Sequence, residues 1–434
     1  MNVTPAQVYI LGGGFAGLYT ALQLDRFPWK RSLKPQITLI DKNDRFLFTP
    51  FLYEFVTQEF QQWEIAPPYL KLLVGTDIQF CRGTVEQVDL KNRQVRLQAG
   101  QVLTYDRLVL AVGRETSLDI IPGAASYALP FRTLADADRL KAKLRSLEAS
   151  EQSIIRVAIA GGGPSGVELA GKLADRLQER GQIHLIERGA TLLKSFTTFS
   201  QKTAHQVLAA HRVRVDLETN IQSIGYDSMT LENQGQVKTV AVDLVLWTAG
   251  TGVNSSLRHL DCRQNPQGQL LTRPTLQLVD YPEVFALGDL ANICDYRGKP
   301  IPATAQSAYQ QASCAAYNLR ASLTKRSLRH FHYLHLGEML TLGINTAIVS
   351  SLGFINLKGY IGHLSRQLVY LLLRMPTLRH RIQVGKHWLF RFFHIWLSGN
   401  RSKRRVSKNR WQSASYADRD SRKTVDNNSV NQHK

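Results

Sequence analysis

Cysteine is scarce in this chain of 434 residues. The four cysteines form no C-x-x-C pair and show no spacing typical of metal ligands, so the sequence predicts neither a metal site nor a redox-active dithiol. Their scatter favours a reducing compartment, in which each thiol packs as a small apolar group. The positions are Cys81, Cys262, Cys294 and Cys314.

Long apolar runs are missing as well. No segment approaches the roughly twenty apolar residues that a membrane-spanning helix needs. A strand-like run begins a few residues after Met1, so we expect no signal or transit peptide. The length is sufficient for two or three domains, each with a core of its own.

Acidic residues are absent from residues 339–417, and the whole chain has a net charge of +20. Such an excess favours an acidic partner, either nucleic acid or an anionic membrane surface. Much of the positive charge lies in this stretch, at Lys358, Arg366, Arg374, Arg379, Arg381, Lys386, Arg391, Arg401, Lys403, Arg404, Arg405, Lys408 and Arg410.

Apolar residues within the basic stretch help to choose between these partners. Residues 361–372 place Ile and Leu at helical spacing, which suits a packed helix and a membrane surface about equally. Residues 386–397 mix Trp, Phe, Arg and His, as helices in a lipid headgroup interface do. Basic residues interleaved with Leu and Phe make a poor track for phosphates. We therefore expect residues 358–410 to contact an anionic membrane surface, and we expect no nucleic-acid partner.

The last residues, 401–434, have a different character. They contain ten Lys or Arg against three Asp and show no apolar periodicity. Such a composition predicts a disordered basic tail, whose role the sequence does not reveal.

What the sequence does contain is a glycine-rich turn after its first apolar run, residues 8–11. Gly12 permits a tight turn, Gly14 lets a pyrophosphate approach the backbone, and Gly17 lets the next helix pack closely. A second strand ends at Asp41, which could bond a ribose hydroxyl. A glycine-rich turn can be purely structural, but this βαβ layout favours a dinucleotide site.

The same pattern returns about 150 residues later, at Gly161, Gly163 and Gly166. The strand that follows ends in Glu187, within the usual interval. Two complete patterns are far more specific than one. Glu187 favours NADH because a carboxylate repels a 2′-phosphate, whereas the adjacent Arg188 could pair with that phosphate, so NADPH stays open.

Three further strands end at glycines. Residues 108–111 lead to Gly113, where the chain leaves one domain, and residues 242–247 lead towards Gly250. Residues 284–287 lead to Gly288 and Asp289. A Gly-Asp pair is often only a turn, but after two dinucleotide patterns we favour Asp289 as a residue near the ribityl chain of a flavin.

Two dinucleotide patterns followed by F-A-x-G-D resemble the flavoprotein reductases with two dinucleotide-binding domains. The Ala305-Gln306-Ser307-Ala308 segment is similar to the Ala-Gln motif of type II NAD(P)H:quinone oxidoreductases. With residues 47–54, 63–68 and 336–340, the chain looks particularly like the cyanobacterial and plastid branch, the demethylphylloquinone reductases. The resemblance covers about residues 7–398. Disulfide reductases and sulfide:quinone oxidoreductases fit less well because each needs cysteines that this chain lacks.

The resemblance implies an α/β fold with two Rossmann-like dinucleotide-binding domains and a C-terminal amphipathic membrane-associating region. Residues 1–115 and 265–330 would form a discontinuous FAD-binding domain, and 116–264 would bind NAD(P)H. Residues 331–400 would associate with the membrane. The expected FAD site comprises Gly12, Gly14, Gly17, Asp41, Gly113, Gly288, Asp289, Ala305 and Gln306, and the expected NAD(P)H site comprises Gly161, Gly163, Gly166, Glu187 and Gly250.

The implied activity is that of an FAD-dependent NAD(P)H:quinone oxidoreductase. Hydride would pass from NAD(P)H to FAD, and two electrons would then reduce a membrane quinone, such as demethylphylloquinone in phylloquinone biosynthesis. Glu168 is expected to act at the nicotinamide or in proton transfer, unless it is a surface carboxylate or a carboxylate at a helix N-terminus that the helix dipole stabilises. Gln306 is expected to bind a quinone carbonyl.

Several alternatives stay open at this stage. The chain could be a respiratory dehydrogenase that uses plastoquinone or menaquinone, or a flavin-containing electron carrier or assembly factor. A peripheral position is expected on the cytoplasmic side of a thylakoid or plasma membrane in a cyanobacterium-like cell. A homodimer is left open.

Overall fold

The computed structural model describes residues 4–391, apart from 255–256, 258–259, 296–297 and 352. The chain divides into two compact units, residues 1–374 and 375–434. The predicted basic tail and residues 392–397 lie outside the described residues. Among the described helices, none is long and apolar enough to cross a bilayer.

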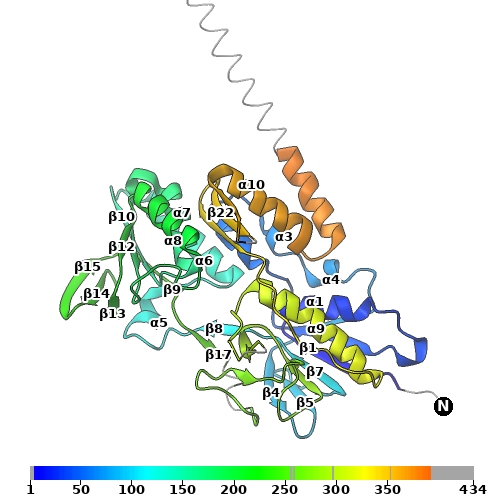
Figure 1. The fold of residues 1–434 in the computed structure, drawn as a ribbon. Coiled ribbons are helices and arrows are strands. Elements are labelled where there is room, and N and C mark those ends of the chain that lie inside the picture. The colour runs from blue at the N-terminus through cyan, green and yellow to red at the C-terminus, as the bar shows by residue number, and fades with distance from the viewer. Residues whose placement is uncertain (1–3, 255–256, 258–259, 296–297, 352, 392–434) are drawn as a thin grey trace, which may run out of the picture. The chain divides into compact units, whose positions relative to one another are not determined.

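The first unit contains two five-stranded parallel sheets (Figure 1). Both are built mainly from short runs of buried apolar residues, as expected for parallel strands covered on both faces. The first sheet has the order β19-β7-β1-β2-β3, and its strands are β1 (Gln7–Leu11), β2 (Gln36–Asp41), β3 (Gln79–Arg82), β7 (Arg107–Leu110) and β19 (Val284–Ala286).

Strand β19 is far from the others in sequence, yet it pairs in parallel with β7. The helices of this sheet, α1 (Phe15–Asp25) and α9 (Ala305–Leu323), pack side by side (Figure 1). The sheet and its helices therefore combine residues 7–110 with residues 284–323. The segments between the strands and helices of this sheet contain further short helices and two small sheets. These elements are η2 (Thr49–Phe51), α2 (Leu52–Val56), α3 (Gln62–Ile65), α4 (Tyr69–Leu72), β4 (Val85–Asp89), β5 (Gln94–Leu97), β6 (Val102–Thr104), β18 (Leu270–Leu271), η5 (Gly288–Leu290) and β20 (Ala291–Asn292).

The second sheet has the order β12-β11-β10-β16-β9. Its strands are β9 (Ala128–Pro130), β10 (Ile155–Ala160), β11 (Gly181–Ile186), β12 (Arg214–Asp216) and β16 (Leu244–Trp247). The associated elements are α5 (Ala124–Tyr127), α6 (Leu134–Ala149), α7 (Pro164–Leu177), α8 (Thr198–Ala210), β13 (Thr219–Ile224), β14 (Ser228–Asn233) and β15 (Gln236–Ala241).

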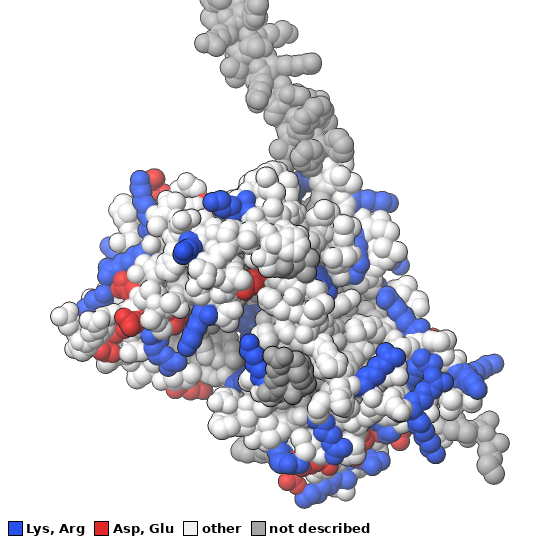
Figure 2. Space-filling view, viewed as in Figure 1, with Lys and Arg blue, Asp and Glu red and all other residues white. Residues whose placement is uncertain are grey.

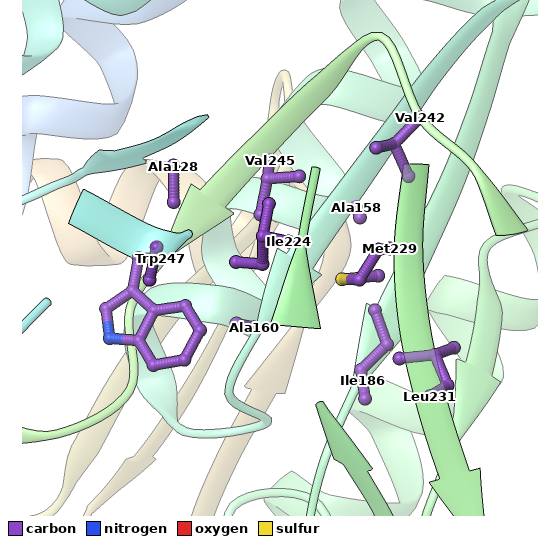
Figure 3. Packing of buried hydrophobic residues seen from close by; sticks show 11 residues of the cluster. Ala128, Ala158, Ala160, Ile186, Ile224, Met229, Leu231, Val242, Val245 and Trp247 are labelled. Carbon is purple, nitrogen blue, oxygen red and sulfur yellow. The ribbon is translucent and has the colours of Figure 1, made fainter. Parts of the chain in front are cut away.

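A buried apolar cluster joins this sheet to the antiparallel sheet β13-β14-β15. Ile224, Met229 and Leu231 of the smaller sheet pack with Ala158 and Ile186 of the larger one (Figure 3). Each of these side chains is almost fully removed from water, and burial of one large apolar side chain contributes about 1.5–3 kcal/mol. The cluster therefore fixes the small sheet beside the strand ends that carry the second glycine turn.

The chain passes between the two parallel sheets through two short strands, β8 (Arg114–Thr116) and β17 (Thr251–Val253). These two strands pair with each other in antiparallel orientation. Gly113 and Gly250 directly precede these strands, and both have a left-handed φ, of 69° in each case. The strand-to-glycine junctions are thus brought together at one two-stranded ribbon.

The residues after α9 form an antiparallel sheet and a helix: β21 (Glu338–Gly343), β22 (Thr346–Ser351), β23 (Ile355–Lys358), α10 (Gly359–Val369) and a π-helical turn, η6 (Tyr370–Arg374). Strand β21 packs on α7, and α10 packs on β22. In the second unit, residues 378–391 are helical.

Arg366 corrects one expectation about this basic stretch. It was expected to face an anionic membrane, but its side chain is fully buried and its Nη1 lies 2.5 Å from Oε1 of Glu54 in α2. That prediction is wrong for Arg366, because an arginine neutralised inside the protein offers no charge to lipid.

We expect Glu54→Gln to lower the free energy of unfolding by about 3 kcal/mol, since it leaves a buried guanidinium without its carboxylate. Chemical denaturation measures this. Glu179→Gln is the matched control, because Glu179 pairs with Arg212 at the surface, where the side chains are 86% and 82% exposed. Equal losses from the two substitutions would contradict the assigned burial.

Candidate functional site

The first glycine turn combines two crowded glycines with one open glycine. A Cβ on Gly12, whose φ is +95°, would lie 2.5 Å from the carbonyl oxygen of Ala111, and a Cβ on Gly17 would lie 1.8 Å from that of Gly12. Neither position can hold a larger residue without moving the backbone. A Cβ on Gly14 would meet no described atom within 4 Å. Gly14 therefore borders open space at the N-terminus of α1, where the first N–H groups lack partners in their own helix.

Asp41 and Tyr69 hold the peptide between these glycines. The N–H of Gly13 donates to Oδ2 of Asp41 at 2.6 Å, and the Tyr69 hydroxyl donates to the Gly13 carbonyl oxygen at 2.9 Å. Burial, with Asp41 nearby, raises the pKa of Tyr69, so the hydroxyl stays a donor. Tyr69 was not predicted. Gly13, which lies between Gly12 and Gly14, was the available signal, because the Tyr69 ring occupies the space that a Gly13 side chain would need.

The second glycine turn repeats this construction. Gly161 has a φ of +106°, a Cβ on Gly166 would lie 1.9 Å from its carbonyl oxygen, and a Cβ on Gly163 would meet nothing within 4 Å. Glu187 takes the place of Asp41, because its Oε2 accepts the N–H of Gly162 at 2.6 Å. One chain thus builds the same open turn and acid twice, on two parallel sheets.

Gly288 and Asp289 lie beside the first turn, as the distance of 3.7 Å between an added Gly288 Cβ and the Cβ of Ala16 shows. The Asp289 carboxylate pairs with Nη2 of Arg132 at 2.6 Å. The same guanidinium nitrogen would lie 4.0 Å from a Cβ on Gly113. The structure therefore brings Gly113, Gly288 and Asp289 together with Arg132, which the sequence did not reveal.

Ala305 and Gln306 begin α9, and the Gln306 side chain organises residues 333–337. Its amide oxygen accepts from the Tyr333 hydroxyl at 3.0 Å and from the Leu336 N–H at 2.9 Å, and its Nε2 donates to the Gly337 carbonyl at 3.2 Å. One N–H of the Nε2 group is not needed for this contact. Gln306 is thus held in place by three hydrogen bonds to residues 333–337.

Glu168 is buried, so the alternative of a surface carboxylate is wrong, although the residue does lie near the N-terminus of α7. Its Oε1 accepts the N–H of Thr341 in β21 at 2.9 Å and lies 3.7 Å from Nη2 of Arg366. Burial raises the pKa of Glu168 to about 7, although Arg366 opposes the shift. The side chain can therefore hold or release a proton near neutral pH.

Further buried charges connect α2 with α7. The Lys172 ammonium lies 2.5 Å from Oε2 of Glu59 and 3.7 Å from Oε1 of Glu54. Ser165 lies in the second glycine turn, and its Oγ accepts a hydrogen bond from the Tyr53 hydroxyl at 3.0 Å. The sequence analysis missed these residues. The spacing of Glu168 and Lys172, four apart in an apolar helix, was the one local sign of a buried pair.

The sequence pattern described as pyridine nucleotide-disulphide oxidoreductase matches residues 6–312, which is more than half of the chain. The chain belongs to this family. All four cysteines are free and half-buried. This chain therefore has no cysteine pair for the disulphide chemistry that the family's description names.

Two curated relatives are similar over most of their length. The demethylphylloquinone reductase of Synechocystis sp. is 46% identical over 91% of this chain and 98% of its own. The alternative NAD(P)H-ubiquinone oxidoreductase C1 of Arabidopsis thaliana is 38% identical over 88% and 80%. These likenesses extend beyond the family pattern into the C-terminal part.

Among solved structures, NDH2 from Plasmodium falciparum in complex with NADH has a similar fold. It gives a TM-score of 0.78 at 18% identity and covers 90% of this chain and 98% of its own. The fold is thus the α/β fold of the FAD- and NAD(P)-binding flavoprotein reductases.

The geometry of the two glycine turns leaves room for a dinucleotide at each. Gly14 and Gly163 each leave the volume of a side chain empty at the start of a long helix. Asp41 and Glu187 each stand at the end of the adjoining strand, where a ribose would lie.

We expect Gly163→Ala to raise the KM for NADH about tenfold, because the added methyl group occupies the open space and not the protein core. Flavin content and melting temperature should stay as in the unchanged protein. Gly14→Ala is the matched variant and should lower flavin content instead. Unfolding of either variant without ligand would contradict the open space assigned to these positions.

Proposed function

We propose that this chain is an FAD-dependent NAD(P)H:quinone oxidoreductase that acts on a prenylated naphthoquinone such as demethylphylloquinone. The observation that carries the proposal is the pair of open nucleotide turns in a chain 46% identical to the Synechocystis demethylphylloquinone reductase. The acceptor named for that relative supports the naphthoquinone as substrate.

The first turn would hold FAD through Gly12, Gly14, Gly17 and Asp41, with further binding residues after β7, after β19 and at the start of α9. Those residues are Gly113, Gly288, Asp289, Ala305 and Gln306. The second turn would hold NAD(P)H through Gly161, Gly163, Gly166, Glu187 and Gly250. When bound, the flavin accepts hydride from NAD(P)H and supplies two electrons to a quinone.

The side chains of the protein then have three tasks. Arg132 holds the Asp289 carboxylate in place beside the first turn. Glu168 holds a proton at its carboxyl group below about pH 7 and carries a charge above it. Gln306 can donate its remaining N–H to a quinone carbonyl oxygen, because its other contacts fix the amide plane.

Glu187 supports NADH as the preferred reductant. Both of its carboxylate oxygens accept backbone N–H groups, from Gly162 and from Gly189, each at 2.6 Å. These bonds keep a negative charge where a 2′-phosphate would lie. Arg188, the residue that could accept that phosphate, has an exposed side chain.

A membrane surface supplies the quinone, and α10 with η6 presents an apolar face suited to it. Ile361, Leu364, Leu368 and Leu372 lie one helical turn apart, and each is between 47% and 66% exposed. The surface over α10 in Figure 2 is largely uncharged, and residues 339–417 contribute no acid to it. We infer peripheral contact with an anionic membrane through residues 358–410 other than Arg366.

The function is tested by adding NADH to the purified yellow protein and then a naphthoquinone. We expect NADH to bleach the flavin absorbance and the quinone to restore it. Gln306→Leu should slow the restoration about tenfold and leave the bleaching unchanged, because only the quinone would lose a hydrogen bond.

Gln310→Leu is the matched control for this substitution. Gln310 also binds the 333–337 segment, at Leu334, but one turn further from the start of α9. A loss of both bleaching and restoration in Gln306→Leu would indicate damaged folding and contradict the assigned role.

Membrane contact is tested with sedimented vesicles that contain phosphatidylglycerol. The double substitution Leu364→Glu and Leu368→Glu should weaken binding more than tenfold, since each leucine contributes about 1.5–3 kcal/mol when it leaves water. Val237→Glu, at an exposed apolar position on β15, should bind as the unchanged protein does. Unchanged binding of the double variant would overturn the proposed surface.

A further inference from the structure

Five charged side chains alternate in sign along one buried line. The order is Glu59, Lys172, Glu54, Arg366 and Glu168, and we call this set the charge chain. The nitrogen-to-oxygen distances along it are 2.5, 3.7, 2.5 and 3.7 Å. Side-chain exposure is 0% or 1% for the three central members, 8% for Glu168 and 13% for Glu59.

The charge chain contains three acids and only two bases. Burial penalises the charged form of each acid, so ionising all three together is costly and favours a proton on one of them. Glu54 is not that acid: burial opposes its ionisation, but Arg366 and Lys172 outweigh burial and lower its pKa. Burial raises the pKa of the two terminal acids, Glu59 and Glu168. The shared proton therefore belongs at one end or the other.

We propose that Glu59 and Lys172 are positioning residues that set the charge of Glu168, acting through Glu54 and Arg366. The inference rests on the proposed function, in which Glu168 holds a proton below about pH 7 and carries a charge above it. A proton on Glu59 leaves Lys172 to interact with Glu54 alone. The ion pair between Glu54 and Arg366 then weakens, and the Arg366 guanidinium can stabilise the Glu168 carboxylate.

Other groups around Glu168 do not replace this coupling. The charged and titratable neighbours are Arg366 from α10, Tyr370 from η6, and Glu54 and Tyr53 from α2, while β21 contributes the N–H of Thr341. Burial raises the pKa of Tyr370 to about 12, and it also raises the pKa of Tyr53. Both tyrosines are therefore neutral in the pH range where Glu168 titrates. The charges that stabilise or destabilise the Glu168 carboxylate are therefore those of Arg366 and Glu54.

The protonation of Glu168 is measured directly in the full-length flavoprotein. The infrared band of a protonated carboxyl group that disappears in Glu168→Gln belongs to this residue, and its intensity against pH gives the titration curve. We expect Glu59→Gln to move that curve to lower pH by roughly one unit, because one negative charge is lost. Adding Lys172→Met to Glu59→Gln should move it back to, or above, its original position.

Glu179→Gln serves as the control, because Glu179 follows α7 but pairs only at the surface with Arg212. Its curve should match that of the unchanged protein. No shift in Glu59→Gln, or a shift in the same direction after Lys172→Met is added, would overturn the charge chain. Thermal unfolding of each variant identifies a folding defect, and Glu59→Asp then provides a conservative variant that should restore the original curve.

The pH profile of quinone reduction distinguishes this inference from the proposed function. We expect quinone reduction to show an inflection near neutral pH, where Glu168 titrates. If that inflection persists in Glu168→Gln, Glu168 does not cause it and the role assigned to this residue in the function is wrong. The infrared titration still decides whether Glu59 and Lys172 control the charge of Glu168.

Discussion

The buried ion pair between Glu54 and Arg366 links α2 to α10, two elements of the first unit that lie far apart in the sequence. Its two residues are 312 positions apart, and both side chains are buried. Glu54 comes from α2, Arg366 comes from α10, and Lys172 joins them from α7. Three parts of the chain thus converge on one carboxylate.

Buried charges of this kind are weak evidence for stability. Replacing such a pair with apolar residues of similar volume is often neutral or favourable, whereas removing one partner is destabilising. Apolar packing could have joined α2, α7 and α10 equally well. The five buried charges, with burial raising the pKa of Glu168 to about 7, therefore support the proposed control of its proton and not a role in stability alone.

Local patterns in the sequence were sufficient for the two nucleotide turns. A strand, spaced glycines, a helix and a terminal acid lie within about 35 residues each time, so the sequence near Gly12 and Gly161 contains most of what the site requires. The family resemblance and the α/β fold follow from the same patterns. The pairing of β19 with β7 shows that the chain returns to its first sheet after the second.

The charge chain could not be predicted in this way, because its links join residues far apart in sequence. Arg366 lies in a stretch without acids, and a count of nearby charges assigns it to the surface. Its actual partner depends on how α10 packs, which only the folded chain reveals. The same argument applies to Tyr69 and Arg132, each of which supports a predicted residue from a distant position. A glycine turn is a local constraint on the backbone, whereas the charge on Glu168 depends on contacts from three separate elements. The turns proposed to hold nucleotides can therefore be predicted from the sequence, whereas the charge chain proposed to control a proton is visible only in the folded structure.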